Sequence, residues 1–443
     1  MLILLAVPIL ALQLCYIYIL VRRTDIGLIS VVFANTLVLI IGEPQAVVGG
    51  FHLSGTDTIY ICCLVAGVIR ISQRAKMLTF SRAMAFGFLA LFAFSLLRGF
   101  AANGIATTSN EARGFVGPLL AVLYFLDVDV GERSVRRYVH IYMAFGTILC
   151  IIAVLAALGV PVGSTKLPWA TAGDVNSRFV PADSAGAIGV CWLFSLSVYQ
   201  FRKRGLALQL GSVAFLVFAI YMRHRTVWVM LLAATMSLIF IDGRIFRRIV
   251  PIVLVAAIFV GGLAIYGSAH FEGASESDFS ESASNAQTFQ WRVNSWVQLF
   301  YDPDQTLSTV MIGKSIGSGY WRIDPETDLP ITVAPHNEFV QDYLRVGAIG
   351  VLCLFAFSVR PILLLWRTKR SSLFDVYPSS SAWALVSFAA LVFSITYSLA
   401  PHQYALIGIA NAVASRIKQD EGSELSIDKT SEWDNSSLSS VAD

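Results

Sequence analysis

Long apolar segments separated by short polar stretches make up most of this chain. An apolar run of about 20 residues can span the hydrocarbon core of a bilayer as a helix. The sequence contains about thirteen such runs, of which the third and the last are the weakest. They are residues 2–20, 26–42, 55–70, 83–99, 113–127, 138–160, 182–200, 206–222, 226–242, 246–266, 341–366, 381–399 and 402–415. We therefore predict an all-α, polytopic helical membrane protein with about 12–13 transmembrane helices, whose membrane domain covers residues 1–415.

The composition supports a membrane location and argues against several functions. Hydrophobic residues make up 56% of the chain and charged residues 14%, against about 25% charged residues in soluble domains. The net charge of +3 is too small to indicate nucleic-acid binding. All six cysteines fall within apolar segments, so they predict neither a zinc site nor a disulfide framework. The first apolar run lacks a basic start and a cleavage pattern, so we predict a retained helix rather than a signal peptide.

Basic residues gather in alternate loops, and this alternation predicts the orientation of the chain. Loops rich in lysine and arginine stay in the cytoplasm. The basic loops are 22–23, 70–82, 133–137, 202–204, 244–248 and 367–370, and the neutral or acidic loops between them are 43–54, 98–112, 161–181, 267–336 and 400–401. The pattern predicts an exterior N-terminus and a large exterior loop at 267–336. The tail at 416–443, rich in Ser, Asp and Glu, is predicted to be cytoplasmic and disordered.

One short loop on the predicted exterior side is basic, because it carries Arg223 and Arg225. Arginines at helix ends commonly reach out to lipid phosphates. The alternative is that these two bind an anionic ligand, for which the planar guanidinium is well suited. Histidines favour the same side of the membrane. Those on the predicted exterior are His52, His224, His270, His336 and His402, whereas His140 falls on the inner side.

The large loop at 267–336 has an acidic, Ser-rich first part and a second part with helical character. The first part, 272–281, lacks the spacing of a calcium-binding EF-hand and is typical of a solvated loop. Residues 290–300 have apolar side chains near helical spacing, which predicts an amphipathic surface helix. In it, Trp291 and Trp296 would lie in the membrane interface and Arg292 at headgroup depth. Several glycines between 312 and 320 then predict a turn.

The end of this loop combines a histidine with a helix start. Pro335 and Asn337 mark the beginning of a helix, and Gly347 and Gly350 would let another helix pack closely against it. His336 therefore precedes a helix that enters the membrane from the outer side. An imidazole at this position can act as a general base or donate a hydrogen bond to a phosphate.

The order of these pieces resembles the O-antigen ligase and O-antigen polymerase superfamily of bacterial membrane glycosyltransferases. Its signature is a His-Asn or His-Ser pair at the end of a large periplasmic loop, followed by an apolar helix that opens with Gly-x-x-Gly. The residues that carry the resemblance are His336-Asn337 with Gly347 and Gly350, Arg292-x-x-x-Trp296, the glycine turn at 313–319, Arg225-Thr226, and Arg178-Phe179 before Ala185-Gly186-Ala187. It covers roughly residues 175–360 of the chain, while the N-terminal third shows only generic hydrophobicity.

The resemblance implies glycan transfer at the periplasmic face of the bacterial inner membrane. Members of the superfamily take a sugar chain from undecaprenyl pyrophosphate without a metal or another cofactor. They attach it to a second lipid-linked repeat unit in polymerases, or to lipid A–core in ligases. The resemblance makes His336 the catalytic residue, and the donor pyrophosphate would be bound by Arg225, Arg292 and Arg223. Supporting roles are expected for Asn337, Arg178 and His402.

We predict a polymerase of exopolysaccharide or O-antigen repeat units. Its partners would be an undecaprenyl-pyrophosphate-linked oligosaccharide, a glycan acceptor, membrane lipids, and chain-length regulator or export proteins. A ligase is the first alternative, since no residue distinguishes the acceptors. The second alternative is a transporter of an anionic solute, which favours mid-membrane ionisable residues and internal repeats, neither of which is evident. A scaffold whose arginines only contact lipid is the third.

Overall fold

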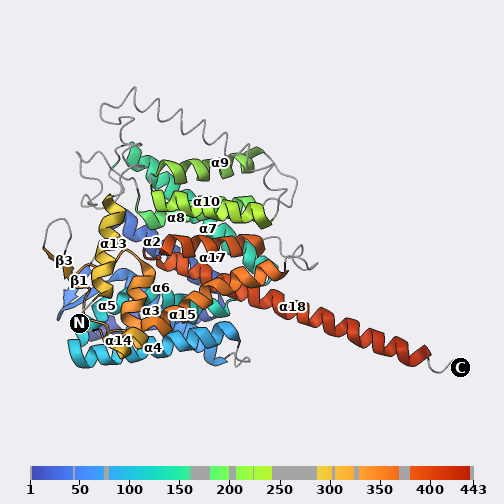
Figure 1. The fold of residues 1–443 in the computed structure, drawn as a ribbon, viewed down its shortest axis with the longest axis horizontal. Helices are drawn as coiled ribbons and strands as arrows, with labels where there is room; N and C mark the ends of the chain where they lie inside the picture. The colour runs from blue at the N-terminus through green and yellow to red at the C-terminus, as the bar shows by residue number, and fades with distance from the viewer. Residues whose placement is uncertain are drawn as a thin grey trace.

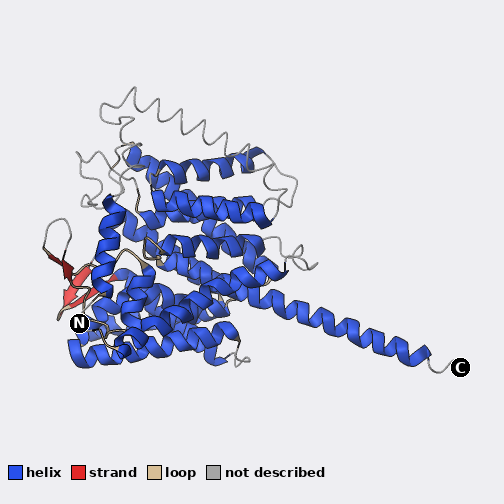
Figure 2. Cartoon of the chain, in the orientation of Figure 1, coloured by secondary structure: helices blue, strands red, loops and turns tan. Residues whose placement is uncertain are grey.

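The computed structural model of the protein describes residues 2–42, 45–73, 79–158, 160, 180–198, 206–222, 224–241, 287–301, 305–323, 329–368 and 380–439. This part of the chain is mainly helical (Figures 1 and 2). Among the described residues, five helices are long and apolar enough to cross a membrane, namely α2 (Thr24–Ile41), α3 (Gly55–Gln73), α4 (Phe80–Asn103), α7 (Glu132–Ala157) and α15 (Glu338–Thr368). The helical fold class predicted from the sequence is thus confirmed.

Shorter apolar helices coincide with most of the remaining predicted runs. They are the Pro8–Arg22 part of α1 (Leu2–Arg22), together with α8 (Ala182–Val198), α9 (Leu206–Tyr221), α10 (Arg225–Ile241) and α17 (Ser380–Ser394). The predicted run at 246–266 lies outside the described residues. Most of these helices lie roughly side by side in Figure 1 and share one large hydrophobic core, to which α2, α3, α7, α8, α10 and α17 all contribute.

The predicted run at 113–127 is not one continuous α-helix. It is divided into η1 (Arg113–Phe115), α6 (Val116–Leu119), a π-helical turn η2 (Leu120–Tyr124) and η3 (Phe125–Asp127), and it follows the short helix α5 (Ile105–Ala112). Glycine and proline weaken an α-helix, and this run contains Gly114, Gly117 and Pro118. Gly117 also permits close packing, since a Cβ there would come within 2.5 Å of the Tyr404 ring.

That tyrosine belongs to α18 (Pro401–Ser439), the helix that contains the weak last run at 402–415. Residues 402–414 are all buried, so this segment lies in the protein core and not against lipid. A core helix needs less hydrophobicity than a lipid-facing one, which explains the weak signal. The helix continues to Ser439, beyond the point where the sequence predicts a disordered tail, and it projects away from the other described elements (Figure 1).

Short helices and strands gather at the end of the molecule opposite to the projecting end of α18 (Figure 1). The predicted loop at 43–54 forms an antiparallel hairpin of β1 (Gln45–Val48) and β2 (Phe51–Ser54), turned by Gly49 and Gly50, both with positive φ. The predicted surface helix is α13 (Gln287–Phe300), followed by α14 (Leu307–Ile312) and by the pair β3 (Arg322–Ile323) and β4 (Pro330–Ile331). Figure 1 shows α13 crossing the ends of the long helices, on the side where the chain begins.

Contacts with α15 hold this end in place. Trp296 of α13 is half-buried and packs against a cluster of Leu299, Tyr320, Val340 and Leu344. Gly347 interrupts α15 with a φ of 68°, and a Cβ there would lie 2.3 Å from the backbone of Met311. The close approach predicted for this glycine is therefore made by α14.

Candidate functional site

The candidate site is built around a short non-helical segment, residues 395–400, between α17 and α18. A turn closes the end of α17, in which the Tyr397 amide donates to the Phe393 carbonyl at 3.1 Å. The segment then ends at Pro401, which begins α18. Proline is favoured at the first position of a helix because its missing N–H is not needed there. The side chains and carbonyls of Thr396 and Tyr397 are thereby offered to neighbouring elements.

Arg292 of α13 contacts this segment through both terminal nitrogens of its guanidinium group. One terminal nitrogen donates to the Thr396 carbonyl at 3.0 Å and the other to the Tyr397 hydroxyl at 3.2 Å. The group also lies over the Tyr397 ring, 4.6 Å from its centroid, which is a cation–π distance. Its buried Nε has no acceptor among the described residues. The arginine is therefore held in a fixed position with one donor unused.

The start of α10 reaches the same segment. Thr226 and Thr396 share a hydrogen bond between their hydroxyl groups at 2.7 Å. Arg225 directly precedes Thr226 as the first residue of α10 and is half-buried. His224, one residue earlier, is buried, and its ring is fixed by a 2.8 Å contact between Nε2 and the Val180 carbonyl. The backbone that carries Arg225 is thus fastened on both sides.

His336, just before α15, lies close to Tyr397 of the segment 395–400. Its ring centroid is 6.1 Å from that of Tyr397, and the residue is exposed. Surrounding protein partly desolvates the ring, and this lowers the pKa of His336 below its usual value; the positive charges of Arg292 and Arg322 lower the pKa further. A lowered pKa favours the neutral imidazole at pH 7, which is the form that can accept a proton.

Asn337 and Glu338, the two residues that follow His336, hold the start of α15 against the segment 395–400. Asn337 is buried; its Oδ1 accepts from the Val340 amide at 3.0 Å, as a helix cap does. Its Nδ2 donates to the Ile395 carbonyl at 2.7 Å. Glu338, also buried, accepts from the Leu399 amide at 2.8 Å and from the Tyr404 hydroxyl at 2.7 Å. Asn337 thus has a structural role that positions His336.

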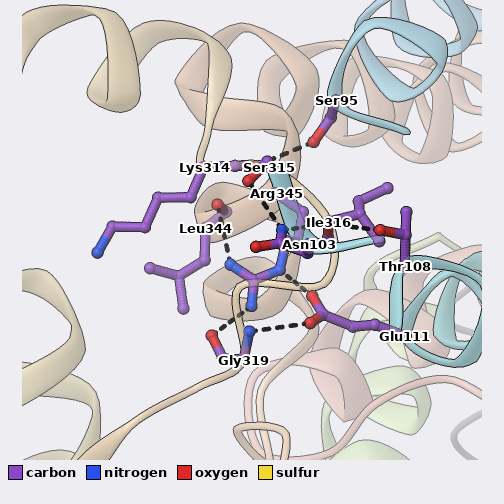
Figure 3. Close-up of polar contacts among 10 residues, drawn as sticks. All are labelled: Ser95, Asn103, Thr108, Glu111, Lys314, Ser315, Ile316, Gly319, Leu344 and Arg345. Atoms are coloured by element: carbon purple, nitrogen blue, oxygen red, sulfur yellow. Dashed lines mark hydrogen bonds and ion pairs between the residues drawn. The ribbon is translucent and has the colours of Figure 1, made fainter. Parts of the chain in front are cut away.

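A second polar network holds the glycine turn at 313–320 (Figure 3). The Arg345 guanidinium of α15 forms an ion pair with Glu111 of α5 and donates to the Gly319 carbonyl. The Gly319 amide in turn donates to Glu111 at 3.1 Å. Arg345 is fully buried and also lies 4.2 Å from the centroid of the Tyr320 ring. The predicted turn is therefore a docked segment, joined to α5 and α15.

Bonds to α4 fix the other half of this turn. The Ser95 hydroxyl donates to the Lys314 carbonyl at 2.9 Å, and Asn103 donates to the Ile316 carbonyl at 3.0 Å. The Lys314 amide donates to the Leu344 carbonyl at 2.7 Å. Positive φ angles at Gly313, Gly317 and Gly319 allow the backbone to follow this path.

The remaining residues named from the sequence are placed elsewhere or lie outside the described part. His402 is fully buried in α18, where its ring packs against Phe145 and Tyr142 of α7, with centroids 5.2 and 6.2 Å away. The predicted exterior position of His402 is therefore wrong, because the residue belongs to the first turn of α18 and residues 402–414 of that helix are all buried in the core. Arg178, Arg223 and the acidic stretch 272–281 lie outside the described residues.

The most connected residues of the site were missed by the sequence analysis. Thr396, Tyr397 and Glu338 have no motif of their own, and the first two fall within a run that was predicted to be an apolar helix. The polar sequence Thr396-Tyr397-Ser398 shortly before Pro401 is the signal that indicates the end of that helix.

Comparison with known proteins adds no further assignment. No protein-family model matches the chain, and no curated protein matches it. Among the described residues, no group of three or more His, Cys, Asp or Glu side chains could hold a metal ion. The functional argument therefore depends on the geometry of the site.

Proposed function

We propose that this protein is a membrane glycosyltransferase of the bacterial inner membrane that uses a lipid-pyrophosphate donor and needs no metal. It would transfer a glycan from undecaprenyl pyrophosphate to a sugar acceptor on the periplasmic face and thereby polymerise exopolysaccharide or O-antigen repeat units. The proposal includes the predicted topology of about 12–13 membrane helices, with α13 and the glycine turn in the periplasmic loop.

One observation carries this proposal. Arg292 and His336 both contact Tyr397, and Thr226, which follows Arg225, contacts the adjacent Thr396. Arg225, Arg292 and His336 are thus brought to one short segment from positions up to 111 residues apart in the sequence. A cationic group and a histidine with a lowered pKa at one end of a helical bundle suit a reaction between a pyrophosphate and a hydroxyl group.

The chemistry assigns one task to each side chain. Neutral His336 accepts the proton of the acceptor hydroxyl while its oxygen forms the new bond to the sugar carbon. The bond between that carbon and the pyrophosphate oxygen breaks, and the leaving group departs with its electron pair. Arg225 and Arg292 neutralise the negative charge that develops on this oxygen. The unused Nε of Arg292 is a donor that an anion beside it would satisfy.

The test is a transfer assay with purified protein and a lipid-linked oligosaccharide as the sole sugar source. We expect glycan chains to grow without lipid A–core. Transfer that occurs only when lipid A–core is added would assign the ligase reaction instead. Movement of an anionic solute across vesicles, without any transfer, would favour the transporter.

Matched variants connect the activity to the site. His336→Ala and Arg292→Gln should each lower the rate of transfer by at least about 100-fold, the typical contribution of a general base or of one charge-stabilising donor. The controls are His140→Ala, at an exposed position, and Arg136→Gln, at a partly exposed position, both on α7. Equal activity of the site variants and the controls, with all proteins folded in the membrane, would refute the proposal.

A further inference from the structure

A cavity with a volume of about 690 Å³ opens between the last turns of α1 and α3. Its wall from α1 is one face of that helix, at positions 14, 17, 18, 21 and 22. Leu14, Ile17, Val21 and, from α3, Ile69 make much of this wall apolar. The volume falls within the range of about 300–1,000 Å³ that is typical of small-molecule sites.

The other part of the wall is cationic. Arg22 and Gln73 are the last residues of α1 and α3, and Arg70 lies one turn before Gln73. Arg22 is exposed, and its guanidinium group is 5.6 Å from the centroid of the Tyr18 ring. The charges therefore collect at one end of the cavity, where both helices finish.

Arg70 is fixed in its position. Only 2% of it is exposed, it donates to the Asp127 carbonyl, and it lies 5.5 Å from the centroid of the Tyr124 ring. The ends of two helices carry partial negative charges of about 0.5 each. Two guanidinium groups exceed this charge, so the polar end of the cavity attracts anions. Basic residues that only stabilise helix ends would not require an open, apolar space beside them.

We propose that this cavity binds a glycerophospholipid with an anionic headgroup from the cytoplasmic leaflet. The headgroup phosphate would lie between Arg22 and Arg70, and an acyl chain would extend along Val21, Ile17 and Leu14. The proposal depends on the predicted orientation, in which both helices end in the cytoplasm, and not on the transferase activity. Anionic lipids of that leaflet attract basic residues close to a helix end.

The test is native mass spectrometry of the full-length protein with added phosphatidylglycerol or phosphatidylcholine. We expect phosphatidylglycerol to bind about tenfold more tightly, because its headgroup carries a net negative charge, whereas the choline cation of phosphatidylcholine offsets the charge of its phosphate. Arg22→Gln should lower this preference about fivefold, because it weakens phosphatidylglycerol binding more than phosphatidylcholine binding. Arg136→Gln is the control, because that arginine is partly exposed and already pairs with Glu132.

A second variant tests the apolar part of the cavity. Ile17→Trp should fill this space and weaken the binding of both lipids. Arg22→Gln, at an exposed position, tests the headgroup contact without disturbing the fold. Equal affinity for both lipids, or an Arg22→Gln variant with the normal preference, would overturn the proposal. Stronger binding of a polyprenyl phosphate than of phosphatidylglycerol would overturn the assignment to a phospholipid. Because the glycan-transfer assay measures a separate site, neither failure affects its result.

Discussion

Removing Glu111 or Arg345 breaks the same ion pair, but the two substitutions should lower the free energy of unfolding by different amounts. The Arg345 side chain is only 1% exposed, whereas that of Glu111 is 14% exposed. Glu111→Ala leaves a buried guanidinium group without its counter-ion, and removing one partner of a buried pair costs about 3–5 kcal/mol. Arg345→Met leaves a partly solvated carboxylate that still accepts from the Gly319 amide, so its cost should be about 2–3 kcal/mol.

The double variant tests the reason for this difference. With both charges gone, neither member of this pair leaves an uncompensated buried charge, and we expect the double variant to be more stable than Glu111→Ala alone by about 1–2 kcal/mol. The assay is reversible unfolding in mixed detergent micelles, with the free energy of unfolding measured for each variant. The pair of Glu132 and Arg136, whose side chains are 53% and 39% exposed, is the control and should contribute about 0.3–0.5 kcal/mol.

Two results would refute this reasoning. If Arg345→Met were as destabilising as Glu111→Ala, the solvent exposure of the charged group left behind would not determine the loss of stability. If the double variant lost the sum of the two single losses, the residues would not interact. Glycan transfer measured on the same variants would then show whether the docking of the glycine turn, which leads to Tyr320 and Arg322, also positions the candidate site.

Three further predictions concern the site and the backbone. Tyr397→Phe, which keeps the ring but loses the hydroxyl, should slow transfer about 5–30-fold, and Tyr397→Leu should slow it more. Equal rates for the two variants in the transfer assay would show that the cation–π contact between Arg292 and the Tyr397 ring does not contribute to transfer. Because the pKa of His336 is lowered, the rate should fall with decreasing pH only at a pH below the ordinary pKa of a histidine. Arg292→Gln should move this limb of the pH–rate profile to higher pH, since a positive charge is removed. Gly347→Ala should lower the unfolding temperature strongly, whereas Gly211→Ala, where a Cβ meets open space within α9, should raise it slightly.

The length of the apolar runs predicted the long elements well, because an apolar run has few alternatives to a helix in a membrane. It failed where glycine and proline interrupt the run at 113–127 and where α17 ends at Ser394, short of the predicted residue 399. In both places the backbone leaves the helix to pack closely or to expose polar groups. A hydropathy count averages over such positions and therefore does not detect them.

Part of the candidate site could be predicted from the sequence, and part could not. His336, Arg292 and Arg225 stand out because charged or titratable side chains are unusual at the ends of apolar helices. Asn337 stands out only as a helix start. Contacts between distant segments leave no local pattern, and the bond between Arg345 and Glu111 joins residues 234 positions apart.

The tyrosine segment at 395–400 explains how loops can form a well-defined site in this protein. The segment is only a few residues long and is continuous with α17 and with the fully buried start of α18, so the helical core fixes its position. Arg292, Thr226 and Asn337 then attach to it from three different elements. Each partner is positioned by the core through this segment, and not by its own loop. A substitution in the core beneath the segment, such as Tyr404→Phe, should therefore alter transfer without touching either substrate.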